Sequence, residues 1–151
     1  EIKDKYSSNF IETRIVPEIF KGICRLHNNR IYHCDLKPEN VFYLDESQSD
    51  LVIGDYGSSK TFDEESSKDY KVSSMVLGTK YYRAPEQGEG FISPKNDYYS
   101  LGIIILRLLY PEEFSENFTE IIGRRFNGKQ ILDFDPKYGR LNQLIAGLTL
   151  P

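Results

Sequence analysis

Apolar residues near the start of the chain recur at the spacing of an amphipathic helix. Those between residues 10 and 27 stand mostly three or four positions apart: Ile11, Ile15, Ile19, Phe20, Ile23, Cys24 and His27. This spacing places them on one face, so the pattern predicts a helix over residues 10–27 that buries that face. Pro17 lies inside the segment and should kink the helix or mark its true beginning, because proline lacks a backbone N–H.

Two short apolar runs follow, and together they predict a β-hairpin. VFYL covers residues 41–44 and LVIGD covers residues 51–55, with the polar, turn-forming DESQSD between them. Short apolar runs joined by such a connection are typical of paired antiparallel strands.

The second half of the chain contains a segment that is apolar on nearly every side. It runs from Asp97 to Tyr110, and Pro111 should end it. A helix with this pattern is usually buried in the middle of a domain. Asp97 is expected to cap its N-terminus. A final amphipathic piece, LNQLIAGLTL, precedes Pro151.

Residues 58–74 differ in kind from these segments. SSKTFDEESSKDYKVSS offers few apolar anchors and predicts a mobile surface loop. The predicted order is therefore helix, hairpin, polar loop, buried helix and further helices. The fold class is mainly α with a small β-hairpin, because the strands are too few for a parallel α/β sheet.

Composition narrows the class of protein. The chain has 151 residues, the size of one domain, with 39% hydrophobic and 28% charged residues, a globular balance. A net charge of −4 argues against nucleic acid as the main partner. Two cysteines are too few for a disulfide framework, and a reducing, cytoplasmic compartment fits them. The polar N-terminus predicts no signal peptide, and the run at residues 101–110 is shorter than the roughly 20 residues of a membrane span.

Candidate chemistry begins in IYHCDLKPEN, residues 31–40. Asp35 on a loop can accept a proton from a hydroxyl, and Lys37 can stabilise phosphoryl charge. Asn40 offers a neutral oxygen that suits a hard cation such as Mg²⁺. A surface turn with solvated charges explains this stretch equally well when it is considered alone.

Three further stretches are ordinary turns or caps in isolation. VIGDYGSSK places Asp55 directly after a strand and before Gly57, an arrangement that fits a metal ligand or a plain β-turn. GTKYYRAPE covers residues 78–86, and NDYYSLG covers residues 96–102.

The four stretches in this order resemble the signature of the eukaryotic-type serine/threonine protein kinases. HCDLKPEN resembles the catalytic loop of that family, and DYG resembles its metal-binding motif. GTKYYRAPE resembles the end of the activation segment, and NDYYSLG resembles the start of the central helix. The resemblance implies the large, C-terminal lobe of a kinase, and residues 1–151 would be part of a longer kinase domain whose small β-rich lobe is missing from this chain.

The resemblance also assigns roles to residues. Asp35 would be the catalytic base, and Lys37 would steady the transferred phosphoryl group of ATP. Asn40 and Asp55 would hold Mg²⁺, and Phe42 would lie under the adenine ring. Supporting residues would be His33, Tyr56, Gly57, Thr79, Glu86 and Asp97.

These supporting residues have expected contacts. His33 and Tyr56 would stack in the core beneath the site, and Thr79 would contact the catalytic loop. Asp97 would tie that loop to the central helix. Glu86 has no evident partner, because the chain stops before the family's last helices.

One departure from the family pattern concerns regulation. Cys34 replaces the arginine that usually precedes the catalytic aspartate and often pairs with a phosphate on the activation loop. A thiol cannot form a bidentate ion pair. We therefore expect activation to depend less on phosphorylation of the loop.

Three functions remain open at this point. The first is a protein kinase that transfers the ATP γ-phosphoryl group to a Ser or Thr of a protein substrate, with the isolated chain inactive. The second is an inactive kinase-like binding module. The third is a small-molecule phosphotransferase, which GTKYYRAPE disfavours because this segment resembles a platform for a peptide.

Overall fold

The computed structural model describes residues 6–44, 50–62, 70–71, 77–111 and 135–149. The first half of the chain forms α1 (Ser8–Phe10), the π-helical turn η1 (Ile11–Ile15), α2 (Val16–Asn28), β1 (Ile31–Tyr32), η2 (Pro38–Asn40), β2 (Val41–Tyr43), β3 (Leu51–Ile53), η3 (Tyr56–Ser58) and β4 (Lys60–Thr61). The remainder forms β5 (Tyr70–Lys71), α3 (Pro85–Gly88), β6 (Phe91–Ile92), α4 (Pro94–Leu109), η5 (Pro136–Tyr138) and α7 (Gly139–Leu148). The mainly helical architecture with a small hairpin is confirmed.

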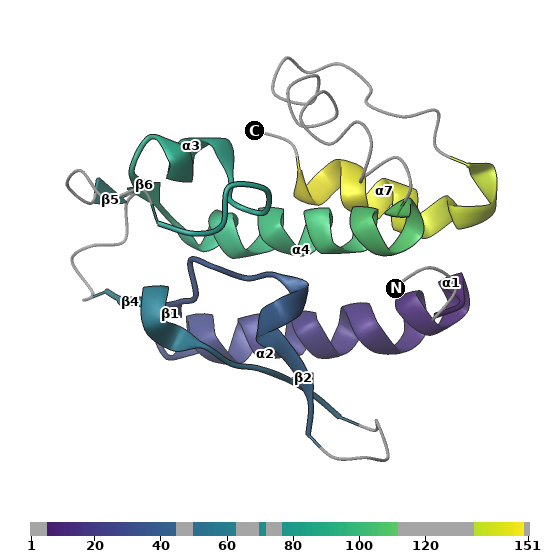
Figure 1. The fold of residues 1–151 in the computed structure, drawn as a ribbon, viewed down its shortest axis with the longest axis horizontal. Helices are drawn as coiled ribbons and strands as arrows, with labels where there is room; N and C mark the ends of the chain where they lie inside the picture. The colour runs from purple at the N-terminus through teal and green to yellow at the C-terminus, as the bar shows by residue number, and fades with distance from the viewer. Residues whose placement is uncertain (1–5, 45–49, 63–69, 72–76, 112–134, 150–151) are drawn as a thin grey trace.

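Helix α4 lies between α2 and α7 and packs against both (Figure 1). Most of its residues are buried, as the nearly continuous apolar pattern predicts. Gly102 permits the close approach of the end of α7, because a Cβ at this position would lie 2.5 Å from the Cγ2 atom of Thr149. No helix in the described part of the chain is long and apolar enough to cross a bilayer.

The N-terminus of α4 corrects one prediction. Ser93, not Asp97, is the N-cap, and its hydroxyl accepts a hydrogen bond from the Lys95 N–H. The Asn96 side chain in turn accepts from the Ser93 N–H and completes a capping box. Pro94 occupies the first helical turn, where a missing N–H costs nothing. Asp97 is thereby left one turn inside the helix, free to serve another purpose.

The N-terminal helical segment follows the apolar pattern and changes its winding at the proline. One π-helical turn over residues 11–15 precedes α2, and Pro17 lies in the first turn of α2. Proline has no N–H and cannot donate the α-helical hydrogen bond to the carbonyl four residues earlier. The wider, π-helical turn lies directly before the regular helix that contains this proline. Pro17 does not mark the beginning of the helical segment, which starts at Ser8, but it lies where the winding changes from the π-helical turn to the regular helix. Phe20, predicted on the buried face, is instead largely exposed and lies against the ring of Tyr98.

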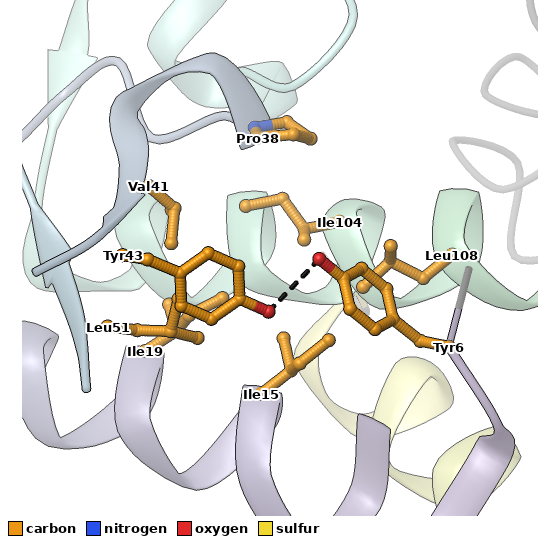
Figure 2. A pocket seen from close by; sticks show the side chains of 9 residues that line it. All are labelled: Tyr6, Ile15, Ile19, Pro38, Val41, Tyr43, Leu51, Ile104 and Leu108. Carbon is orange, nitrogen blue, oxygen red and sulfur yellow. Dashed lines mark hydrogen bonds between the residues drawn. The ribbon is translucent and has the colours of Figure 1, made fainter. Parts of the chain in front are cut away.

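Strands β2 and β3 form the predicted antiparallel hairpin, with Val41 opposite Ile53. The hairpin packs over α2 and α4 and leaves an apolar pocket of about 170 Å³ (Figure 2). At this pocket the Tyr43 hydroxyl donates a hydrogen bond of 3.0 Å to the Tyr6 hydroxyl. Two further strand pairs, β1 with β4 and β5 with β6, were not predicted, because each strand has only two residues.

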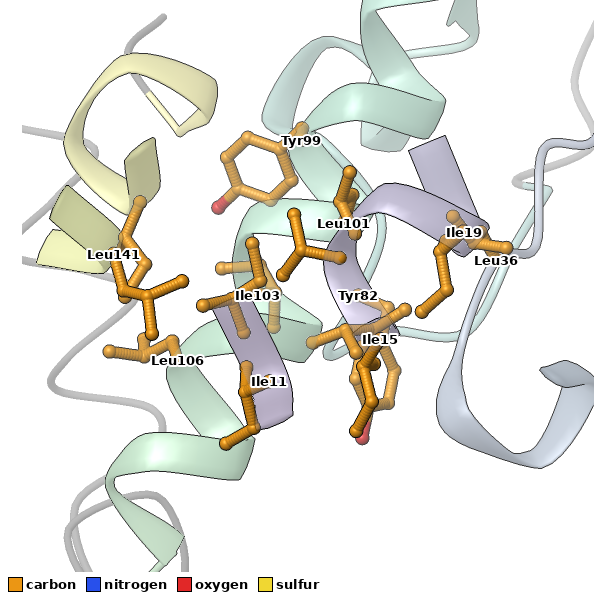
Figure 3. Packing of buried hydrophobic residues seen from close by; sticks show 14 of the residues in the cluster. Ile11, Ile15, Ile19, Leu36, Tyr82, Tyr99, Leu101, Ile103, Leu106 and Leu141 are labelled. Carbon is orange, nitrogen blue, oxygen red and sulfur yellow. The ribbon is translucent and has the colours of Figure 1, made fainter. Parts of the chain in front are cut away.

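The core joins the helices to the loop after β1. Figure 3 shows Ile11, Ile15 and Ile19 facing the side chains of α4, with Leu141 of α7 on the far side. Leu36, from the loop between β1 and η2, is completely buried in the same cluster. The loop that contains Asp35 is therefore anchored to the core by its neighbour in the sequence.

Candidate functional site

The backbone of the loop before η2 is held by a buried carboxylate. Asp97 of α4 accepts hydrogen bonds from the backbone N–H groups of His33 (2.9 Å) and Cys34 (3.0 Å). The same carboxylate lies 2.8 Å from the ring Nε2 of His27. Cys34 has a left-handed backbone, with φ at 64°, which a residue with a side chain adopts only when its surroundings require it. Asp97 thus fixes the direction in which the chain enters Asp35.

His33 connects this loop to the end of the hairpin. Its buried ring accepts a hydrogen bond at Nδ1 from the Asp35 N–H at 3.3 Å, so Nε2 carries the proton and donates to the Gly54 carbonyl at 2.9 Å. The Gly54 N–H donates to the Asn40 carbonyl at 2.9 Å. These bonds place Asp55, the residue after Gly54, beside the loop that contains Asp35.

Asp35 is surrounded by donors. Its Oδ1 accepts from both the N–H and the hydroxyl of Thr79, at 2.6 and 2.7 Å, and its Oδ2 accepts from Lys37 at 2.9 Å. The Lys37 ammonium also donates to the Thr79 hydroxyl at 3.0 Å. Burial alone would raise the pKa of Asp35, but the hydrogen bonds from Thr79 and Lys37 outweigh it and hold the pKa below its usual value. The carboxylate is therefore ionised at neutral pH.

Lys37 is the cationic partner in this cluster. Its hydrogen bond to Asp35 raises the pKa of Lys37 above its usual value, although burial opposes the shift. The negative charges of Glu39 and Asp55 act in the same direction as the hydrogen bond. The end of the hairpin lies close to the loop, because the Gly54 N–H bonds to the Asn40 carbonyl and Ile53 pairs with Val41.

Asn40 and Asp55 meet at the same end of the hairpin. Asn40 is buried, and its Nδ2 donates to the Asp35 carbonyl at 2.9 Å, which leaves its Oδ1 to coordinate a cation. Asp55 has a left-handed backbone, with φ at 59°, and its Oδ1 accepts from the Gly57 N–H at 3.3 Å. One carboxylate and one amide oxygen fit Mg²⁺, which usually takes one or two protein carboxylates and completes its shell with water and phosphate oxygens. Within the described residues, no group of three or more His, Cys, Asp or Glu side chains forms an alternative metal centre.

Two aromatic residues flank this cluster at the surface. Phe42 and Tyr56 are 48% and 47% exposed. The prediction that His33 and Tyr56 stack in the core is therefore wrong for Tyr56. The two rings are 5.5 Å apart and tilted, and the Tyr56 hydroxyl donates to the Ile53 carbonyl at 2.7 Å. That hydroxyl needs a partner, and the nearby carbonyl holds the ring at the edge of the fold.

Cys34 points away from the cluster as a neutral thiol. It is buried, and its thiol donates to the Tyr32 carbonyl at 3.4 Å. Burial, together with the negative charge of Asp97, raises the pKa of Cys34 to about 12. The expectation about loop phosphorylation stays a prediction, because residues 63–69 and 72–76 of the polar loop lie outside the described residues.

Several contacts that support the site could not be predicted from the sequence. Glu86, expected to lack a partner, accepts from Nδ2 of Asn96 at 3.0 Å. Gln87 donates to the carbonyl of Cys34 at 2.6 Å and to that of Leu77 at 3.3 Å. Asn96 stood in a quoted motif but its partner Glu86 did not follow from it, and no sequence signal marked Gln87.

Gly78 is required where the segment before Thr79 meets the loop. Its φ is 83°, and an added Cβ would lie 2.6 Å from the Cys34 carbonyl oxygen. This close approach brings Thr79 within reach of Asp35. The glycine was quoted in the motif, but its contact with the loop depends on the tertiary fold.

Comparison with known proteins gives consistent matches. The family model described as Protein kinase domain matches residues 3–140. Calcium-dependent protein kinase 5 of Plasmodium berghei is 34% identical over 136 residues, which cover 87% of this chain and 23% of the relative. Calcium-dependent protein kinase 4 of the same organism is 33% identical over 133 residues, 85% of this chain and 24% of the relative.

A third relative is a mouse protein. Eukaryotic translation initiation factor 2-alpha kinase 1 of Mus musculus is 35% identical over 109 residues, which cover 67% of this chain and 17% of that protein. The chain thus spans about a quarter or less of the length of these relatives.

Proposed function

Because the chain belongs to the protein kinase family, we propose that the protein containing it transfers the γ-phosphoryl group of ATP to a serine or threonine hydroxyl of a protein substrate. The observation that carries this proposal is the convergence of Asp35, Lys37 and Thr79 with Asn40 and Asp55 at one end of the hairpin. Phosphoryl transfer depends mainly on positioning and on neutralising charge, which this set of groups can provide.

Asp35 is the residue that receives the substrate hydroxyl in this proposal. Its low pKa keeps it ionised, so it can accept a hydrogen bond from the incoming alcohol and take its proton as the bond to phosphorus forms. The bonds from Thr79 and Lys37 hold both carboxylate oxygens, which fixes the direction of the remaining lone pairs. A carboxylate held in this way loses little conformational freedom when the substrate arrives.

Asn40 and Asp55 would hold Mg²⁺, and Lys37 would contact the transferred phosphoryl group. The bound cation would neutralise charge on the ATP phosphates. Asn40 is positioned for this role by its bond to the Asp35 carbonyl, and Asp55 by its turn with Gly57. Phe42, at the exposed surface of β2, would support the adenine ring.

The serine/threonine preference rests on the link between Lys37 and Thr79. Lys37 donates to both Asp35 and Thr79, so the end of the activation segment and the catalytic loop form one unit. HCDLKPEN and GTKYYRAPE, which contain Lys37 and Thr79, are two of the stretches that resemble the serine/threonine protein kinases.

An inactive binding module is the second candidate, and one observation favours it. The rings of Phe42 and Tyr56 are both about half exposed beside the site, so the described residues do not enclose a nucleotide. We expect residues 1–151 alone to lack phosphotransfer activity, since water would reach both rings and the site.

The test compares the full-length natural protein with its Asp55→Ala variant in a phosphotransfer assay with Mg²⁺, ATP and serine peptides. Losing a metal ligand removes several kcal/mol of charge stabilisation, so we expect activity to fall at least about a hundredfold. Asp50→Ala is the matched control, because Asp50 pairs with Leu44 at the other end of the same hairpin. Equal activity of the wild type and Asp55→Ala would exclude the enzyme and favour the binding module.

A further inference from the structure

An open pocket of about 530 Å³ begins directly beside Asp35. Its lining residues are Lys37, Glu39, Asn40, Thr79, Tyr81, Tyr82 and Arg107. Lys37 and Thr79 are the two residues that donate hydrogen bonds to Asp35. A peptide whose hydroxyl reaches Asp35 would therefore place a neighbouring side chain in this pocket.

Arg107 is the fixed cation of the pocket. It is the only charged residue in the apolar run of residues 101–110 and reaches the pocket from the last turn of α4. Its Nη1 donates to the Tyr82 hydroxyl, and the guanidinium carbon lies 5.9 Å from the centre of the Tyr82 ring. Its side chain is only 28% exposed, so the charge is positioned before any ligand binds.

Glu39 is held much more loosely. A single bond of 3.3 Å joins its carboxylate to Nη1 of Arg107, and its side chain is 57% exposed. An ion pair of this kind contributes little and exchanges readily with another carboxylate. A guanidinium has five N–H donors and can bind a carboxylate through two parallel bonds, which the contact with Glu39 does not achieve.

One of the two cations that line the pocket can exchange its carboxylate partner. Lys37 is paired with Asp35 at 2.9 Å, and Arg107 is paired with Glu39 at 3.3 Å. The pair of Arg107 and Glu39 is the longer and more exposed one, so Arg107 is the cation that an incoming anion would meet. An incoming carboxylate would displace Glu39 into water, where that side chain already largely lies.

We propose that this pocket is a subsite for an acidic side chain of the protein substrate, near the serine or threonine that is phosphorylated, and that Arg107 selects it. The inference rests on the proposed function and names its substrate class. A basic side chain attracted by Glu39 is the competing outcome, and it would have to approach Arg107 against like-charge repulsion.

The test uses the full-length protein with Mg²⁺, ATP and a serine peptide library in which each position flanking the serine is varied in turn. We expect one position where Asp or Glu gives about tenfold higher kcat/KM than Ala, and Lys or Arg gives less than Ala; tenfold corresponds to about 1.4 kcal/mol. Arg107→Glu should reverse this order at that position, whereas Arg107→Lys should keep acid above Ala. Glu39→Gln should strengthen the acid preference, because it removes the competing carboxylate.

Arg140→Gln is the matched control, since Arg140 is highly exposed on α7 and pairs with Glu12 rather than lining the pocket. It should leave the order unchanged. A wild-type preference for basic side chains at every flanking position, or an acid preference that persists in Arg107→Glu, would overturn the subsite. Phosphorylation without any acid preference would overturn the subsite alone. A wild type that phosphorylates no peptide would overturn the proposed function and the subsite with it.

Discussion

Two pockets lie on either side of one short turn, η2, and they differ in size and in the residues that line them. The pocket beside Asp35 is lined mainly by polar and charged residues, among them Lys37, Glu39 and Asn40. The pocket beneath the hairpin is smaller and mostly aliphatic, and Pro38 and Val41 line it (Figure 2). Each of the five consecutive residues 37–41 thus lines either the pocket beside Asp35 or the apolar pocket beneath the hairpin.

The turn is short, and extended residues flank it on both sides. The 3₁₀ turn covers only Pro38–Asn40, and Lys37 and Val41 on either side of it have extended backbones. Lys37, Glu39 and Asn40 line the pocket beside Asp35, while Pro38 and Val41 line the apolar pocket. The turn therefore orients the polar groups and anchors them to the core at the same time.

The comparison teaches that activity and stability should be separable in this molecule. The polar side consists of groups that satisfy one another through charge and hydrogen bonds, with little apolar burial. The apolar side contributes packing and contains no group that could take part in phosphoryl transfer. Substitutions on the two sides should therefore have different consequences.

The largest expected effect comes from Asp35→Asn in the full-length protein. An amide is a far weaker base and would turn an N–H toward Thr79 or Lys37, both of which are donors. We expect kcat for a serine peptide to fall about 10²- to 10⁴-fold, the usual contribution of a general base. The melting temperature of the same samples should fall only modestly, because Asp35→Asn loses hydrogen bonds from Thr79 and Lys37 but no apolar packing. Asp50→Asn serves as the control. Activity within threefold of wild type would show that the two pockets are not divided as we describe.

A smaller but substantial effect is expected from Ile19→Ala on the apolar side. Ile19 is 2% exposed, whereas its neighbour Phe20 is 45% exposed. Removing the buried side chain enlarges the pocket and should lower the free energy of unfolding by about 2–4 kcal/mol, measured by urea denaturation. Phe20→Ala is the matched comparison and should cost less, because much of that ring is already in water. An equal loss in the two variants would mean that the pocket wall does not support the fold.

The smallest expected effect is a change in titration on the polar side. Burial raises the pKa of Asp35, but the hydrogen bonds from Thr79 and Lys37 lower it by more than burial raises it. The pKa in the folded state therefore lies below the unfolded value of about 3.9. The stability that this carboxylate contributes is therefore present above about pH 4 and is lost as the pH falls through the folded pKa. Thr79→Val removes the hydroxyl bond and should raise the pKa of Asp35, which carboxyl carbon NMR can follow. An unchanged titration in Thr79→Val would assign the low pKa to Lys37 instead.

Local patterns predicted much of the fold. The helix over residues 10–27, the hairpin and the buried helix up to Pro111 all follow from the spacing of apolar side chains. The N-cap of α4 was mispredicted although its signal was present, since Ser93 precedes Pro94 and Asn96 stands at the third helical position. Asp97 was predicted to be the N-cap because it is the acidic residue nearest the apolar run.

The candidate site was predicted in part for a similar reason. Asp35, Lys37 and Asn40 lie within six residues of one another, so their proximity needs no tertiary information. Asp55 could be included in the candidate site because it follows the second strand of an antiparallel hairpin, whose end lies beside the start of the first strand. Arg107 was overlooked, although a single charge within an apolar run is a signal that the side chain must reach a partner or the surface.

The sequence by itself predicted the main helices and the hairpin and pointed to the candidate site residues, because side-chain spacing and short motifs are local properties. Only the tertiary structure decided that Asp97 holds the loop through His33 and Cys34, that Asn96 bonds to Glu86, and that Arg107 and Tyr82 meet Glu39. These partners lie on different elements, and their contacts depend on how α4 packs against the loop. Packing is a property of the whole core, and no short stretch of the chain contains enough of that core to specify it.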